Sequence, residues 1–158
     1  MELLIKQRVF SWTDTYDVYD TNQQPVYFVK AEFLTLGHQI YLYDMENRPL
    51  ASTHQKIFRF LPEFELIIGG RSLGTLKKEM TLFRPRYNLD CNGWRVQGDV
   101  WGWDYDVVDA LGNYALHITK EPLHWGDTYV LHIPDPANEL LCLMIAIAID
   151  AANCSDND

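Results

Sequence analysis

An unbroken apolar run near the C-terminus constrains this fold more than any other feature. Every residue from Leu140 to Ile149 is apolar. Before the run, Asp135 suits a helix N-cap, Pro136 suits the first helical position, and Glu139 favours the positive end of the helix dipole. A helix that is apolar on every side must be buried on every side. We therefore expect the rest of the chain to wrap around this helix.

We expect the helix to run from Pro136 to Ala152 and to form the structural core. Its core-forming side chains are Leu140, Leu141, Leu143, Met144, Ile145, Ile147 and Ile149. Insertion into a membrane is the competing interpretation, but the ten apolar residues span about 15 Å, half of a bilayer core. The flanking charges of Asp135, Glu139 and Asp150 also argue against insertion. We therefore predict no transmembrane segment.

Most of the remaining chain alternates between apolar and polar residues, which is the pattern of half-buried strands. Clear examples lie at 63–68, 94–100 and 114–118. One turn template, Tyr-Asp, four residues, Pro and an aliphatic residue, occurs at both 19–26 and 43–50. Short strands with regular turns predict an all-β sandwich or barrel. Only a closed sheet would cover the central helix on all sides.

Size and charge narrow the class of protein. A chain of 158 residues fits one domain, which we place at 1–152, with a short disordered acidic tail at 153–158. The net charge of −9 disfavours nucleic-acid binding, since phosphate neutralisation supplies much of that affinity. Three scattered cysteines do not make a disulfide framework. The first residues lack a signal-peptide pattern, so we expect a cytoplasmic protein, with peripheral association at the membrane as the alternative.

The motifs that carry a family resemblance are spread in order along the chain. They are Leu4-Ile5-Lys6-Gln7-Arg8, Tyr16-Asp17-Val18-Tyr19-Asp20, Phe28-Val29-Lys30-Ala31-Glu32-Phe33, Ile40-Tyr41-Leu42-Tyr43-Asp44, Glu65-Leu66-Ile67-Ile68-Gly69, Gly98-Asp99 and the C-terminal helix. With them the chain resembles the LURP-one-related branch of the tubby-like fold, including its short bacterial members, from Leu3 to Ala152. The resemblance implies a mainly β fold: a closed antiparallel β-barrel of about twelve strands around a hydrophobic C-terminal helix.

What the resemblance implies about function is limited. Relatives include tubby proteins, which look like phosphoinositide readers, and phospholipid scramblases. Plant members are linked to defence, and bacterial members mostly lack an assigned role. Because a fold does not fix a function, the residues themselves must be weighed.

One short motif points to catalysis. Gly70-Arg71-Ser72-Leu73-Gly74 matches the Gly-x-Ser-x-Gly pattern of a nucleophile elbow, which requires a strand before the serine and a helix after it. Residues 75–80 look instead like the returning arm of a hairpin. We therefore favour a glycine-rich turn and keep an esterase acting through Ser72 as a distant alternative, with no catalytic residue assigned.

Other chemistry-bearing side chains are numerous but poorly spaced. They are His38, His54, His117, His124 and His132; Asp14, Asp17 and Asp20; Asp99, Asp104, Asp106 and Asp109; and Trp94, Trp101, Trp103 and Trp125. The histidines lack zinc-site spacing, and strand alternation separates neighbouring carboxylates, so we predict surface positions and no metal or cofactor. For the tryptophans we favour packing onto the helix over a ligand-stacking platform.

The uneven distribution of charge is the most useful functional clue. Residues 1–86 hold 11 basic and 10 acidic residues, whereas residues 87–158 hold 2 basic and 12 acidic. The candidate anionic-lipid site is Lys77, Lys78, Arg84, Arg86 and Arg71. We expect a non-catalytic binding or scaffold module that engages a protein partner or an anionic lipid headgroup. A scramblase-like, membrane-associated lipid-handling protein is the runner-up, and an ordinary mixed surface is the competing interpretation of the charges.

Overall fold

The computed structural model describes residues 1–6, 15–34, 37–99, 104–123 and 126–155. Its strands are β1 (Glu2–Lys6), β2 (Thr15–Tyr19), β3 (Pro25–Leu34), β4 (Gly37–Asp44), β5 (Pro49–Gln55), β6 (Glu63–Ile68), β7 (Arg71–Lys78), β8 (Arg86–Leu89), β9 (Trp94–Gly98), β10 (Asp104–Val108), β11 (Tyr114–Leu123) and β12 (Gly126–His132). A short 3₁₀ helix, η1 (Pro136–Asn138), leads into the α-helix α1 (Glu139–Ser155).

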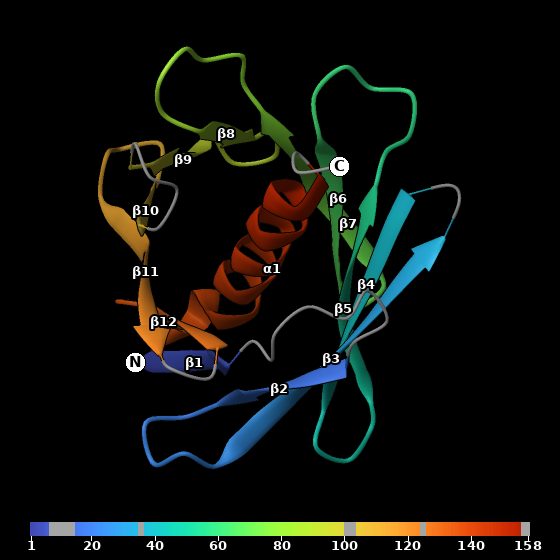
Figure 1. Cartoon of the computed structure of the whole chain (residues 1–158), viewed down its shortest axis with the longest axis vertical. Coiled ribbons are helices and arrows are strands. Elements are labelled where there is room, and N and C mark those ends of the chain that lie inside the picture. Colours follow the sequence, from blue (N-terminus) through green and yellow to red (C-terminus); the bar gives the residue numbers. More distant parts are fainter. Residues whose placement is uncertain (7–14, 35–36, 100–103, 124–125, 156–158) are drawn as a thin grey trace.

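The strands form a closed barrel in which each strand is antiparallel to both neighbours. β1 closes the barrel by pairing with β12, from Glu2 opposite His132 to Lys6 opposite Thr128. Because successive strands run in opposite directions, their connections alternate between the two ends of the barrel. Figure 1 shows the strands surrounding α1. The predicted mainly β, closed antiparallel barrel around a C-terminal helix is confirmed.

The Asp135 cap forms as the sequence predicts, but Pro136–Asn138 form a 3₁₀ turn and the α-helix begins at Glu139, three residues after the expected start. The Asp135 side chain accepts a hydrogen bond from the backbone N–H of Ala137 at 3.0 Å, and Pro136 occupies the first turn of η1. α1 continues to Ser155, past the expected end at Ala152, while residues 156–158 lie outside the described residues. By length and composition the stretch Pro136–Asn153 is apolar enough to cross a membrane, but 56% of it is buried inside the barrel.

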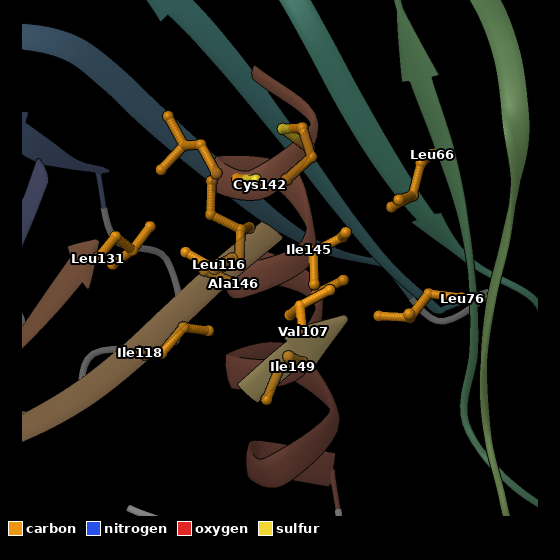
Figure 2. Close-up of a cluster of buried hydrophobic side chains, with 14 of the residues drawn as sticks. Leu66, Leu76, Val107, Leu116, Ile118, Leu131, Cys142, Ile145, Ala146 and Ile149 are labelled. Atoms are coloured by element: carbon orange, nitrogen blue, oxygen red, sulfur yellow. The ribbon is translucent and has the colours of Figure 1, made fainter. Parts of the chain in front are cut away.

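The core lies between the helix and the inward side chains of the strands. Every residue from Cys142 to Ile149 is buried, so the helix presents apolar surface in all directions, as its composition requires. Figure 2 shows four helix side chains, Cys142, Ile145, Ala146 and Ile149, surrounded by strand side chains. The labelled strand residues are Leu66, Leu76, Val107, Leu116, Ile118 and Leu131. The helix thus occupies the space that holds a ligand in a lipocalin-type barrel.

Three hairpins at the end of the barrel where α1 begins have the same type of turn. Asp20, Asp44 and Asp109 start the turns that join β2 to β3, β4 to β5 and β10 to β11. Each carboxylate accepts two backbone N–H bonds of 2.8 to 3.0 Å. The fourth residue of each turn has a positive φ, and these residues are Gln23, Asn47 and Gly112. The turn template predicted at 19–26 and 43–50 is confirmed, because Asp bonds to its own turn.

These turns should make the protein acid-sensitive. The backbone N–H of Arg48 lowers the pKa of Asp44 from its ordinary 3.8, and the Asn113 side chain lowers the pKa of Asp109 in the same way. A lowered folded-state pKa contributes stability above pH 3.8, which is lost as the pH falls through the folded pKa. Urea unfolding measured from neutral pH to about pH 2.5 should show that the free energy of unfolding falls as the pH falls. The fall should be smaller in the Asp44→Asn/Asp109→Asn variant than in the wild type. Equal acid dependence in the variant would contradict the assignment.

Candidate functional site

Most of the predicted basic site lies toward the end of the barrel where α1 ends. Connections that follow odd-numbered strands lie at this exit end, and two of them are fully described: residues 56–62 between β5 and β6, and residues 79–85 between β7 and β8. We call these two segments the exit loops. The backbone N–H of Lys78 donates to the carbonyl of Pro62 at 3.0 Å, so the bases of the exit loops are adjacent. Both loops extend beyond the strands, on either side of the end of α1 (Figure 1).

The five predicted basic residues do not lie together in the structure. Arg84 lies in the second exit loop and Arg86 directly follows it; both are exposed, and neither has an ion-pair partner among the described residues. Lys78 is half-buried at the base of the same loop. Lys77 points to the outer wall, where its Nζ lies 3.2 Å from Asp90 Oδ2.

Arg71 is separated from this group. It begins β7, whereas Lys78 ends it, and at about 3.3 Å per residue the two lie on the order of 20 Å apart. The structure adds Arg59 of the first exit loop, whose Nε lies 3.6 Å from Glu63 Oε2 with 55% of the side chain exposed. The exit-end basic group is therefore Arg59, Lys78, Arg84 and Arg86.

The same end of the barrel carries large exposed apolar side chains that the sequence prediction did not include. Phe58 is 95% exposed, Phe60 88%, Leu82 91% and Phe83 80%. Ile57 and Met80 are also exposed. Apolar residues normally indicate core, which is why the charge-based prediction passed over them. Each loop does carry a local sequence signal, which is a phenylalanine followed by an arginine, with a proline shortly after. The two segments are Phe58-Arg59-Phe60-Leu61-Pro62 and Leu82-Phe83-Arg84-Pro85.

Charges differ between this site and the opposite end of the barrel. The exit loops contain three basic residues, Lys56, Arg59 and Arg84, and one acidic residue, Glu79, which accepts a bond from the Asn88 side chain. The turns at the other end begin with the aspartates described above. The surplus of basic residues on the exit loops favours the approach of an anion to them, whereas the aspartates disfavour its approach to the turns that they begin.

Comparison with known proteins places the whole chain in one family. Its sequence matches the model described as LURP-one-related over residues 1–150. The chain belongs to the LURP-one-related family. It is also 32% identical over 158 residues to "Uncharacterized protein YxjI" of Bacillus subtilis (strain 168), covering 100% of this chain and 97% of that protein. No solved structure matches it.

The Gly-x-Ser-x-Gly motif of this LURP-one-related chain has a structural explanation. Gly70 has φ 75° in the tight turn between β6 and β7, and Gly74 has φ 139° where β7 irregularly pairs with β6. Ser72 is exposed in β7, and its Oγ donates to Glu65 Oε1 at 2.6 Å. A strand therefore contains the serine, without the strand–turn–helix arrangement that a nucleophile elbow requires.

The thiols of Cys91 and Cys142 are not activated. Burial raises the pKa of Cys142 to about 12, and its Sγ donates to the Ala115 carbonyl. Desolvation also raises the pKa of the exposed Cys91 thiol. Because the thiolate is the nucleophile, a raised pKa lowers reactivity at neutral pH.

Two histidines of this LURP-one-related barrel are exposed, as predicted, and each lies near a carboxylate. His117 and His132 lie opposite each other on β11 and β12. His117 Nδ1 lies 2.6 Å from Asp106 Oδ1, and His132 Nδ1 lies 3.6 Å from Glu2 Oε1. Even so, no group of three or more His, Cys, Asp or Glu side chains with metal-binding geometry occurs within the described part of the chain.

Among the remaining candidates, the fold brings Asp99 and Asp104 together. Asp17 lies beside the Tyr19 hydroxyl, and Asp99 accepts from the backbone N–H of Asp104. Trp94 is half-buried and packs against the buried core. The other candidates, Asp14, Trp101, Trp103, His124 and Trp125, lie outside the described residues.

Proposed function

We propose that this LURP-one-related protein is a non-catalytic module that binds anionic lipid headgroups through its exit end, peripherally on the cytoplasmic side of a membrane. The observation that carries the proposal is the pair of exposed guanidiniums of Arg84 and Arg86, which no carboxylate neutralises among the described residues. Arg59 joins them from the neighbouring loop. A guanidinium presents several donors in the planar geometry that suits phosphate.

Electrostatics also sets the orientation of the bound protein. Each basic residue near an anionic membrane contributes about 1 kcal/mol, and the attraction is screened over about 8 Å at physiological salt. With a net charge of −9, the rest of the molecule is repelled by the same surface. Only an approach with the exit end foremost brings arginines within the Debye length while the acidic turns stay away from it.

Charge reversal at the exit end should abolish most of the binding. Arg84→Glu/Arg86→Glu should lower partition into phosphatidylglycerol-containing vesicles at least tenfold, because about 1 kcal/mol of attraction per residue becomes repulsion. Co-sedimentation at low and near-physiological salt measures the effect. The matched control is Arg71→Glu/Arg95→Glu, which makes the same charge change at exposed positions on β7 and β9, away from the exit loops. Equal loss in both variants would show that net charge alone matters.

The alternatives predict different results. If the wild type binds no vesicles at either salt concentration, the lipid proposal is wrong and a protein partner becomes the leading function. A scramblase-like role requires a path for lipid, and the barrel interior holds α1 instead (Figure 1). An esterase role would require an activated nucleophile, which the geometry at Ser72 does not favour.

A further inference from the structure

We propose that the tips of the two exit loops insert into the bilayer, so that Phe58, Phe60, Leu82 and Phe83 contact the acyl chains while the arginines bind the headgroups. This inference rests on the proposed function and deepens it. It names the bilayer itself, rather than a soluble headgroup, as the ligand.

The first support is the amount of apolar surface that the tips leave in water. The four side chains are 80 to 95% exposed, whereas inward-facing residues such as Leu66 and Leu76 are fully buried. Single exposed apolar residues are ordinary, but several large ones on two adjacent loops mark an interaction surface. Burial of such side chains in an apolar phase is favourable, because it removes their surface from water.

The second support is that the loops are fixed at their bases and directed outward. Besides the bond between Lys78 and Pro62, the backbone N–H of Gly98 donates to the Pro85 carbonyl at 2.8 Å. Phe58 has φ 58°, an uncommon conformation for a bulky residue, and its side chain is exposed rather than buried. Such backbone strain occurs where the surrounding structure holds a residue in a required position.

The third support is the alternation of charge and apolar surface along the loops. Arg59 lies between Phe58 and Phe60, and Arg84 follows Phe83. Long basic side chains can reach headgroups while their neighbours lie deeper, which is the arrangement of interfacial membrane segments. A soluble ligand would instead favour a concave pocket that encloses it. The convex, exposed loops therefore fit an anionic bilayer better than a small ligand.

Acidic residues also lie at this end of the barrel. Asp99 and Asp104 border the connection from β9 to β10, and Asp150 lies near the end of α1. Asp99 is close to the second exit loop, because the backbone N–H of the preceding Gly98 donates to the Pro85 carbonyl. A carboxylate there opposes the approach of this end to an anionic surface, so the apolar tips must offset that repulsion.

The test removes the apolar tips and leaves the charges intact. Phe58→Ser/Phe60→Ser/Leu82→Ser/Phe83→Ser should lower partition into phosphatidylglycerol-containing vesicles at least about a hundredfold. It should also abolish the rise in surface pressure that the wild type produces under a monolayer of the same lipid. Leu111→Ser/Met45→Ser is the matched control, because it changes exposed apolar residues in turns at the opposite end. Thermal unfolding should be nearly the same for all variants, since none of these side chains is buried.

The outcomes separate the insertion from the headgroup proposal. A serine variant that binds as the wild type does, while Arg84→Glu/Arg86→Glu does not, would overturn insertion and leave headgroup binding standing. The reverse pattern would support insertion and overturn the headgroup proposal. Absence of wild-type binding to every vesicle would overturn both. Self-association of the wild type that the serine variant loses, measured by sedimentation without lipid, would assign the tips to protein contact instead.

Discussion

Replacing Ile145 with aspartate is expected to unfold the whole barrel. The Ile145 side chain is completely buried in the middle of α1, and strand side chains surround it (Figure 2). An unpaired charge in such a position costs several kcal/mol, and it has no partner nearby among the apolar residues of the core. Domains of this kind are stable by about 5–15 kcal/mol in total. Because α1 packs against the inward side chains of many strands, loss of this packing would remove the hydrophobic core of the barrel.

Circular dichroism and urea unfolding at neutral pH measure this effect. The expected result is a chain without a cooperative transition, whereas Ile145→Val should remain folded and lose only about 1 kcal/mol. Leu111→Asp is the control for adding a carboxylate, because Leu111 is 88% exposed and should tolerate it. A soluble Ile145→Asp protein with a cooperative transition would mean that α1 is not the core of the barrel.

Replacing Gly74 with alanine is expected to lower the free energy of unfolding by about 3 kcal/mol. Gly74 has φ 139°, which side chains rarely adopt, and an added Cβ would lie 2.7 Å from both Asp90 Oδ1 and Cys91 Cβ. The same Asp90 oxygen accepts the backbone N–H of Thr75 at 2.8 Å. The substitution therefore strains the backbone and displaces a carboxylate that ties β7 to the turn after β8.

The control for this prediction lies in the same motif. Gly70 also has a positive φ, but an added Cβ there meets nothing within 4 Å. Gly70→Asn should change stability little, because Asn tolerates the left-handed region. Equal losses in Gly70→Asn and Gly74→Ala would show that backbone strain, rather than the close approach of Asp90, sets the requirement for glycine.

Local sequence patterns predicted those parts of the molecule whose geometry depends on near neighbours. The N-cap at Asp135 and the turns that begin at Asp20 and Asp44 follow from bonds between a carboxylate and backbone groups within a few residues. The residues 63–68 became β6 because alternation specifies one buried face. The helix, apolar from Leu140 to Ile149, required a closed sheet, since no open arrangement buries all its sides.

The candidate site was only partly predictable. Charge counting found Arg84 and Arg86, but it also included Arg71, which lies at the opposite end of β7 from the exit loops, and Lys77, which forms an ion pair with Asp90. Position along a strand and the partner of a charge are both set by pairing between distant segments. The exit loops show this most clearly, because a run such as Phe58-Arg59-Phe60 has the composition of either core or surface.

By itself, then, the sequence determined the central helix, the strands and the turns that join them, because burial and short-range hydrogen bonds act within a few residues along the chain. Only the tertiary structure decided which connections meet at each end of the barrel. The alternation of antiparallel strands places residues 56–62 and 79–85 side by side, and it leaves Phe58 and Phe83 exposed next to Arg59 and Arg84. That juxtaposition depends on long-range pairing, and it is the feature from which the proposed membrane function is drawn.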